Sequence, residues 1–275
     1  MNAITHAIPR VFKSLLATGL MMSMSWTIQA GLTADEIVAQ VDAVDKGNTS
    51  RSQMQMILID DKDRQRTRDL LSTTKMMGPE DNQDEYKLIF FTAPSNVKDT
   101  GFLTYDYTGD KEDDQWLYLP ALGKSKRIPA ADKTSAFMGS DFTYADMTER
   151  NINDYTYKLM QEKEVAGHMT WLLEATPKSQ KVIDNTGYTK SYMFIRQDNF
   201  MVVQALHLMP DNYRKYMTVR ELEQIDGIWV ATDVEMKTTL GKVRQHTTIL
   251  KLSDVQFNQP VSDETFTLRQ LEKGL

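Results

Sequence analysis

The sequence predicts a mainly β protein of the α+β class, built on a strongly curved antiparallel sheet with one N-terminal helix. Three observations lead to this prediction. Most segments after residue 50 alternate apolar and polar residues with a period of two, as strands do. Short turn signals separate these segments, and one amphipathic helical pattern precedes them. About a dozen strands make a sheet too large to stay flat, so it should curl and create an interior.

Residues 1–30 have the pattern of a cleavable secretory signal. They contain two basic residues and no acidic one, an apolar run from Leu15 to about Trp26, and a small residue at Ala30. A membrane anchor is the alternative, but a run of about a dozen residues is too short to cross a bilayer. We therefore expect cleavage after Ala30 and export of residues 31–275 to the periplasm.

The composition limits the classes of partner and chemistry. The formal net charge is −6, and it becomes −8 without residues 1–30, which carry Arg10 and Lys13 and no acidic residue. A chain this acidic is not expected to bind nucleic acid. Cysteine is absent, which excludes disulfides, a thiol nucleophile and a lipidated cysteine. No Pro/Gly/Ser-rich linker divides residues 31–275, so we expect one domain. The protein is expected to be a monomer.

The helical pattern comes first in the exported part. Thr33 and Glu36 have the spacing of a capping box, and Ile37 and Val41 then lie on one apolar stripe before Gly47 ends the pattern. The sequence therefore predicts an amphipathic helix that begins after Thr33.

Strands joined by short turns follow the helix. Met54, Met56 and Leu58 alternate with polar residues, which predicts the first strand. A strong hairpin signal lies at Asp226-Gly227. The other segments expected to form strands are 65–75, 86–90, 102–107, 115–120, 155–165, 169–177, 190–196, 202–208, 213–225, 228–236 and 242–257.

The stretch 115–147 differs from the rest of the chain. Both faces of the strand 115–120 are apolar, so it should be covered on both sides. A basic turn at 124–127 is expected next, followed by about twenty residues without periodicity, longer than an ordinary connection. Because these residues include three aromatic side chains, disorder fits poorly, and we expect an ordered flap over an apolar surface.

The expected ligand site is a hydrophobic cavity beneath this flap. Methionine is frequent, with 17 in the chain, and its unbranched thioether adapts to flexible partners, although core packing is the alternative for any single methionine. The side chains expected to line the cavity are Trp116, Tyr118, Leu122, Phe137, Met138, Phe142, Tyr144, Met147, Met54 and Met56. The polar rim is expected at Lys126, Arg127 and Asp141.

The sequence gives little support for catalysis or metal binding. The histidines lie in or beside different predicted strands, without the spacing of a metal site. The acidic run Gly109–Asp114 is interpreted as a solvated turn, because it lacks the ligand spacing of a calcium loop. Ser140 and Asp141 could suggest a hydrolase, but capping of the short turn after them explains both more simply. We therefore expect no catalytic residue, metal or cofactor.

Residues 116–147, WLYLPALGKSKRIPAADKTSAFMGSDFTYADM, resemble the signature of the LolA-like outer-membrane lipoprotein-sorting family found beside RND-type transporters. The resemblance implies an incomplete β-barrel around a helix, enclosing a hydrophobic cavity for acyl chains or other lipids. It implies a carrier or chaperone that passes a lipid or lipoprotein acyl chain toward the outer membrane with an RND-type transporter. An envelope-stress sensor of lipids on the same fold is the alternative, and a lipid hydrolase using Ser140 is a third.

Overall fold

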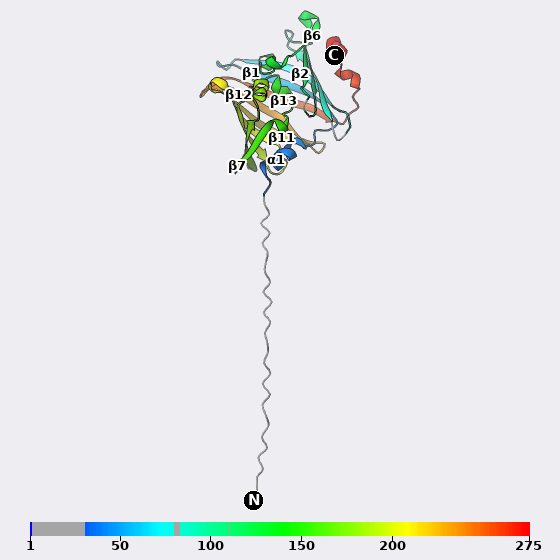
Figure 1. Cartoon of the computed structure of the whole chain (residues 1–275). Helices are drawn as coiled ribbons and strands as arrows, with labels where there is room; N and C mark the ends of the chain where they lie inside the picture. The colour runs from blue at the N-terminus through cyan, green and yellow to red at the C-terminus, as the bar shows by residue number, and fades with distance from the viewer. Residues whose placement is uncertain (2–30, 80–82, 110) are drawn as a thin grey trace. The chain divides into compact units, whose positions relative to one another are not determined.

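One antiparallel sheet of thirteen strands dominates the described part of the chain (Figure 1). The structure is a computed structural model that describes Met1 and residues 31–79, 83–109 and 111–275. The expected signal sequence and the cleavage point after Ala30 fall on residues 2–30, outside the described part. Residues Leu32–Leu275 form one compact unit.

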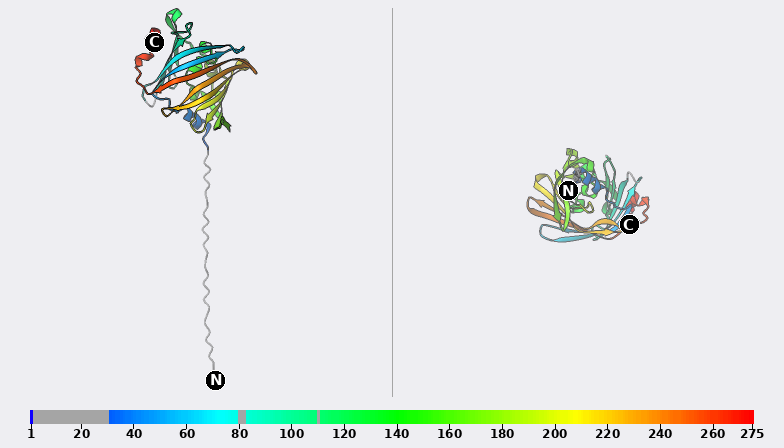
Figure 2. Two further views of the ribbon diagram at one scale, coloured as in Figure 1. Left: turned by 180° about the vertical axis from the view of Figure 1, so that it is seen from behind. Right: turned by 90° about the horizontal axis from the view of Figure 1, so that it is seen from below.

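Strands that are consecutive in the sequence are neighbours in the sheet, except for the sixth and seventh strands, which lie at opposite edges. The strands are β1 (Thr49–Ile59), β2 (Gln65–Met77), β3 (Asp84–Ala93), β4 (Gly101–Asp106), β5 (Asp114–Leu119), β6 (Lys124–Arg127), β7 (Tyr155–Val165), β8 (His168–Pro177), β9 (Lys190–Arg196), β10 (Val202–Leu208), β11 (Tyr213–Ile225), β12 (Ile228–Leu240) and β13 (Val243–Phe257). The order across the sheet is β6-β5-β4-β3-β2-β1-β13-β12-β11-β10-β9-β8-β7, so β1 pairs with β13. The sheet is strongly curved but open, with β6 and β7 at its two edges (Figure 2).

Every strand predicted from alternation is present, and one connection was predicted wrongly. Residues 124–127, expected to be a basic turn, form β6 and pair with β5. The turn before them ends at Gly123, whose φ of 61° lies in the left-handed region that glycine tolerates, and it returns the chain alongside β5. The four residues of β6 are all polar, so they lack the alternation of apolar and polar residues that indicates a strand.

In the part of the chain that the structure describes, three short α-helices accompany the sheet: α1 (Ala34–Asp42), α2 (Gln180–Thr186) and α3 (Leu268–Lys273). The predicted capping box of α1 is confirmed, because Thr33 Oγ1 accepts the Glu36 N–H at 3.3 Å and the Glu36 carboxylate accepts the Thr33 N–H at 2.8 Å. α2 and α3 were not predicted, since seven and six residues are too few to show an apolar stripe. Among the described helices, none has the length and apolarity needed to cross a bilayer.

An apolar layer covers the inner face of β1–β5, and β3–β5 have a second apolar layer on the outer face. Neighbouring residues of a strand point to opposite faces, so on β3 Phe91 belongs to the inner, concave layer and Phe90 to the outer layer. The outer layer is covered by the C-terminal segment, residues 258–273, whose Phe266 and Leu271 are buried (Figure 2). This segment therefore belongs to the core although it contributes no strand.

The flap, residues 128–147, covers the inner layer. It contains the short 3-10 turns Ala130–Asp132, Phe137–Gly139 and Ala145–Met147. The ring of Phe137 is fully buried, with its centroid 6.1 Å from Phe91, 5.0 Å from Phe102 and 5.6 Å from Tyr144. The expectation that the flap lies over an apolar surface is confirmed, and its most apolar side chain is part of the core.

Candidate functional site

A cavity of about 1,110 Å³ lies between the end of α1, the flap, α2 and the inner face of β10–β12. The part of its wall on β10–β12 includes His207, Met217 and Met236, and the apolar side chain of Phe142 comes from the flap. Residues at the ends of β2, β3, β4 and β7 also line it. Ligand-binding cavities commonly measure about 300–1,000 Å³. The cavity is therefore large enough for a ligand with a long chain.

The lining is mixed, whereas the sequence predicts a hydrophobic cavity. Apolar side chains such as Val182 and Met236 line its inner wall. Many charged residues lie at the connections between elements, because loops and strand ends keep polar side chains solvated. The charged residues of the lining are Asp42, Asp45, Lys46, Glu85, Asp106, Lys111, Glu112, Asp113, Lys133, Asp146, Glu149, Arg150, Asp154 and Lys181.

A buried ion pair lies at the inner end of the cavity. Asp146, in the last turn of the flap, accepts hydrogen bonds from Tyr188 Oη at 2.7 Å and from the Thr143 N–H at 2.8 Å. Its Oδ2 lies 3.3 Å from Nζ of Lys215 on β11. Burial acts to raise the pKa of this carboxyl, but Lys215 and the hydrogen bonds outweigh burial and the pKa is lowered. Asp146 therefore stays ionised and balances the charge of Lys215.

His207 lies beside this pair and is neutral. Its ring stacks on Tyr188 with 4.4 Å between the centroids, and its Nδ1 lies 2.8 Å from Ser191 Oγ. Burial, followed by the nearby Arg150 guanidinium, lowers the pKa of His207 to about 3. At neutral pH the inner end of the cavity thus contains one balanced ion pair, a neutral imidazole and the charge of Arg150.

Two ion pairs lie around the outer part of the cavity. Lys46 Nζ lies 2.5 Å from the Glu149 carboxylate, and Lys181 Nζ lies 2.6 Å from Glu112. Burial, followed by repulsion from Asp113, raises the pKa of Asp106 to about 8. Asp106 is therefore largely protonated at neutral pH and adds little negative charge.

The structure brings six of the predicted lining residues together, but in a packed layer. Met54, Met56, Phe137, Met138, Tyr144 and Met147 all belong to the apolar cluster on the inner face of β1–β4. The flap fills this part of the concave surface with its own side chains. Phe142 is the predicted lining residue that is found on the cavity wall.

The remaining predicted lining residues lie elsewhere. Trp116 and Tyr118 pack in the outer layer beneath the C-terminal segment, while Leu117 between them packs on the inner layer. The expectation that both faces of this strand are covered is thus confirmed, and the alternation separates Trp116 and Tyr118 from Phe137. Leu122, in the turn between β5 and β6, is 59% exposed.

The predicted rim residues serve two different purposes. Lys126 and Arg127 are exposed on β6, where Arg127 binds Asp114. Asp141 is buried and accepts hydrogen bonds from His246 Nδ1 at 2.5 Å and from Thr248 Oγ1 at 2.7 Å. Asp141 therefore fastens the flap to β13.

The Ser140 hydroxyl serves the backbone of the flap. Its Oγ accepts the Phe142 N–H at 3.2 Å. The expectation that Ser140 or Asp141 caps the following turn is wrong, because that turn is Ala145–Met147 and its Asp146 N–H is accepted by Thr143 Oγ1 at 3.2 Å. Its other contact is with the Phe142 carbonyl oxygen, at 3.3 Å. These contacts give no support to a hydrolase that uses Ser140.

Sequence reasoning missed the polar residues at the inner end of the cavity. Arg150, Tyr155 and Tyr188 come from loops or strand ends, where no periodicity indicates direction. Lys215 carries a usable signal, because strand alternation places it on the same face as Met217. A charged residue at an inward position of a strand indicates a buried partner.

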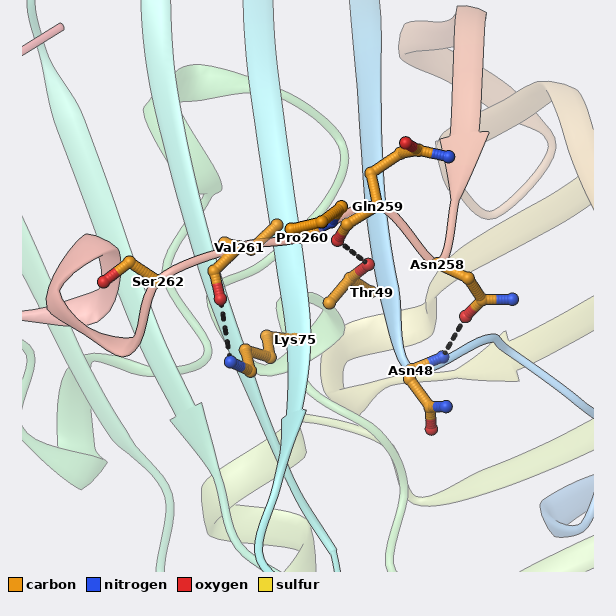
Figure 3. Close-up of a pocket in the computed structure, with 8 residues that line it drawn as sticks. All are labelled: Asn48, Thr49, Lys75, Asn258, Gln259, Pro260, Val261 and Ser262. Carbon is orange, nitrogen blue, oxygen red and sulfur yellow. Dashed lines mark hydrogen bonds between the residues drawn. The ribbon is translucent and has the colours of Figure 1, made fainter.

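A second pocket, of about 540 Å³, lies where the C-terminal segment crosses β1 and β2 (Figure 3). Its polar groups already bind one another. Thr49 Oγ1 donates to the Gln259 carbonyl at 2.7 Å, and Lys75 Nζ donates to the Val261 carbonyl at 2.8 Å. These hydrogen bonds attach the C-terminal segment to the sheet. We therefore interpret this pocket as part of the packing between the segment and the sheet, and not as a ligand site.

Comparison with known proteins shows relatives along most of the chain. A family model described as an uncharacterized protein matches residues 83–273. A DUF1329 family protein from Desulfovibrio piger has 29% sequence identity and a TM-score of 0.78, with 86% of this chain and 97% of that chain covered. A domain from Vibrio parahaemolyticus, named for outer membrane lipoprotein sorting, has 27% identity and a TM-score of 0.78, with coverage of 87% and 98%.

A more distant structure shares the fold alone. It is a LolA superfamily protein from Nitrosomonas europaea, with 17% identity, a TM-score of 0.64 and coverage of 86% of this chain and 98% of that chain. No curated protein matches the chain.

Proposed function

Because the chain belongs to the DUF1329 family and has a LolA-like fold, we propose that it is a periplasmic carrier of a lipid or of a lipoprotein acyl chain. The observation that carries the proposal is the 1,110 Å³ cavity inside an open curved sheet. The related Vibrio domain is named for lipoprotein sorting, which supports the same function. In this proposal residues 31–275 act as one lipid-binding domain after removal of the signal at Ala30.

Burial of an acyl chain provides the affinity. Each buried CH₂ contributes about 0.8 kcal/mol, so a chain of about 16 carbons gains on the order of 10 kcal/mol before the costs of binding are subtracted. The apolar groups of Phe142, Val182, Met217 and Met236 provide contacts for part of such a chain. Methionine side chains adapt to flexible ligands, which suits a carrier.

The flap controls how much apolar surface is accessible in this proposal. In the structure it occupies the concave face of β1–β4 with its own apolar residues. Polar contacts hold the flap. Asp141 binds Thr248 of β13, and Asp146 binds Lys215 of β11. The Met138 carbonyl accepts a hydrogen bond from Arg68 at 2.5 Å. Displacement of the flap would expose the inner layer and enlarge the cavity. An RND-type transporter, acting as the partner, would then drive loading or transfer toward the outer membrane.

The experiment that tests the proposal measures bound lipid directly. The exported protein is isolated from the periplasm without detergent, and co-purifying lipids are identified by mass spectrometry. A variant, Met217→Trp, fills part of the cavity, and the expected result is a bound lipid fraction at least about tenfold lower than in the wild type. Met160→Trp, at an exposed position of edge strand β7, is the matched control and should keep the wild-type lipid.

Thermal unfolding of both variants shows whether the protein still folds. Wild-type protein that carries no lipid, and that takes up none from vesicles, would overturn the carrier function.

A further inference from the structure

The cavity contains an arginine whose charge is not matched by a carboxylate. Arg150, between the flap and β7, lines the cavity. Among the described residues, no Asp or Glu oxygen lies within 4.0 Å of its guanidinium. Its described contacts are Ser191 Oγ at 3.4 Å, Met193 Sδ at 3.7 Å and the face of Tyr155, with 4.7 Å to the ring centroid. These contacts orient the guanidinium without neutralising it.

The other cations of the lining differ from Arg150. Lys46 and Lys181 are paired with carboxylates. Lys111 and Lys133 also have no carboxylate within 4.0 Å among the described residues, but Lys111 is exposed to solvent and Lys133 Nζ donates to the Asp113 carbonyl at 3.0 Å. Bringing a guanidinium out of bulk water without a counter-charge is unfavourable. A ligand anion would remove this cost.

A second donor lies next to Arg150. Tyr155 is 3% exposed and lines the cavity, and its Oη has no hydrogen-bond partner among the described residues. Burial raises the pKa of Tyr155, so its hydroxyl keeps its proton at neutral pH and can donate. Two carboxylates lie near Tyr155: Asp146 is already balanced by Lys215, whereas Asp154 has no salt bridge among the described residues and opposes an anion.

We propose that Arg150, with the Tyr155 hydroxyl beside it, binds the anionic head of the ligand, a carboxylate or a phosphate, while the chain lies along the apolar wall. A planar guanidinium binds such groups through two hydrogen bonds at once. This inference rests on the proposed lipid-binding function and specifies its ligand class. The cavity should therefore select an anionic amphiphile over a neutral one with the same chain.

The test compares ligands that differ only in their head group. Delipidated residues 31–275 are titrated with palmitate, hexadecanol and palmitoyl lysophosphatidic acid by displacement of a neutral naphthylamine dye, and with inorganic phosphate alone. We expect wild-type protein to bind the two anionic lipids at least about tenfold more tightly than hexadecanol. Arg150→Gln should remove this preference and leave hexadecanol binding unchanged, while Arg150→Lys should retain part of it.

Arg64→Gln, at an exposed position in the turn between β1 and β2, is the matched control and should behave as wild type. Equal wild-type affinity for palmitate, lysophosphatidic acid and hexadecanol would overturn the head-group inference and leave the carrier function standing. Binding of none of the lipids would overturn the carrier function itself. Inorganic phosphate that binds as tightly as the phosphate lipid would show an anion site independent of the chain, and would also overturn the inference.

Discussion

At the residue scale, a few buried side chains fix the flap, which has little regular secondary structure of its own. Phe137 fills the inner layer, and the carboxylates of Asp141 and Asp146 bind two different strands. Both carboxylates also accept hydrogen bonds from neighbouring groups, which reduces the cost of burying them. The flap is thus held by specific contacts that single substitutions can test.

Replacing Phe137 tests whether this residue belongs to the core. Because its ring is fully buried among Phe91, Phe102 and Tyr144, Phe137→Ala should lower the free energy of unfolding by about 3–5 kcal/mol. Urea denaturation measures this change. Leu122→Ala, at a position 59% exposed, is the control and should change stability by less than about 0.5 kcal/mol. A small loss at Phe137, accompanied by weaker lipid binding, would instead indicate a mobile lid.

The hydrogen bond from His246 to Asp141 should make stability depend on pH. This bond raises the pKa of His246 above its ordinary value of about 6.5. The stabilisation is therefore complete below about pH 6.5 and decreases as the pH rises through the raised pKa. Urea unfolding of wild type and His246→Gln between about pH 5.5 and 8.5 should show a stability difference that shrinks with increasing pH. A difference that grows over this range would contradict the assignment.

At the scale of elements, the C-terminal segment acts as a second cover for the sheet. Leu271 and Phe266 are buried on the outer face, and Tyr105 Oη donates to the Phe266 carbonyl at 2.5 Å. Gly101 on β4 permits the close approach. A Cβ at that position would lie 2.6 Å from Leu271 Cδ1 and 2.7 Å from Phe90 Cε1. The absence of a side chain at Gly101 thus gives Leu271 and Phe90 the room in which they pack.

Gly101→Val should loosen the C-terminal segment. The added side chain overlaps Leu271 and Phe90, and overpacking of this kind costs about 1–3 kcal/mol. Faster hydrogen exchange in residues 258–273, together with a lower melting temperature, is the expected result. Leu268→Ala, at a position of α3 that is 39% exposed, is the control. Unchanged exchange in this segment would show that the sheet tolerates the larger residue.

At the scale of the whole described unit, the ladder between β1 and β13 joins two series of hairpins. Nine residue pairs connect these strands, from Ser50–Phe257 to Ile59–Thr247. The flap strengthens the connection, because it packs on β1–β4 and also binds β11 and β13. The two halves of the sheet therefore share contacts that are lost together.

Residues 31–275 should accordingly unfold in one cooperative transition. Calorimetry of the delipidated protein is expected to show a single peak, with equal calorimetric and van't Hoff enthalpies. Two resolved transitions would show that the halves on either side of the β1–β13 pair unfold independently.

Local patterns in the sequence determined the strands and the first helix. The alternation of apolar and polar residues, as at Met54, Met56 and Leu58, involves only residues that are close in the sequence. The same is true of the capping box formed by Thr33 and Glu36. The number of strands and their short turns also predicted a curved sheet, because a sheet this large does not stay flat. The family resemblance of residues 116–147 agrees with the fold found in the structural relatives.

Only the tertiary structure decided which side chains meet. Trp116 and Phe137 are close in the sequence, yet they lie on opposite faces of the sheet, because Trp116 follows the alternation of β5 and Phe137 follows the fold of the flap. Arg150, Tyr188 and Asp146 meet at the inner end of the cavity, with Lys215 behind Asp146, and their distances depend on the curvature of the whole sheet. Curvature is a property of the whole sheet, built from strands distant in sequence, so no local pattern could place these residues together.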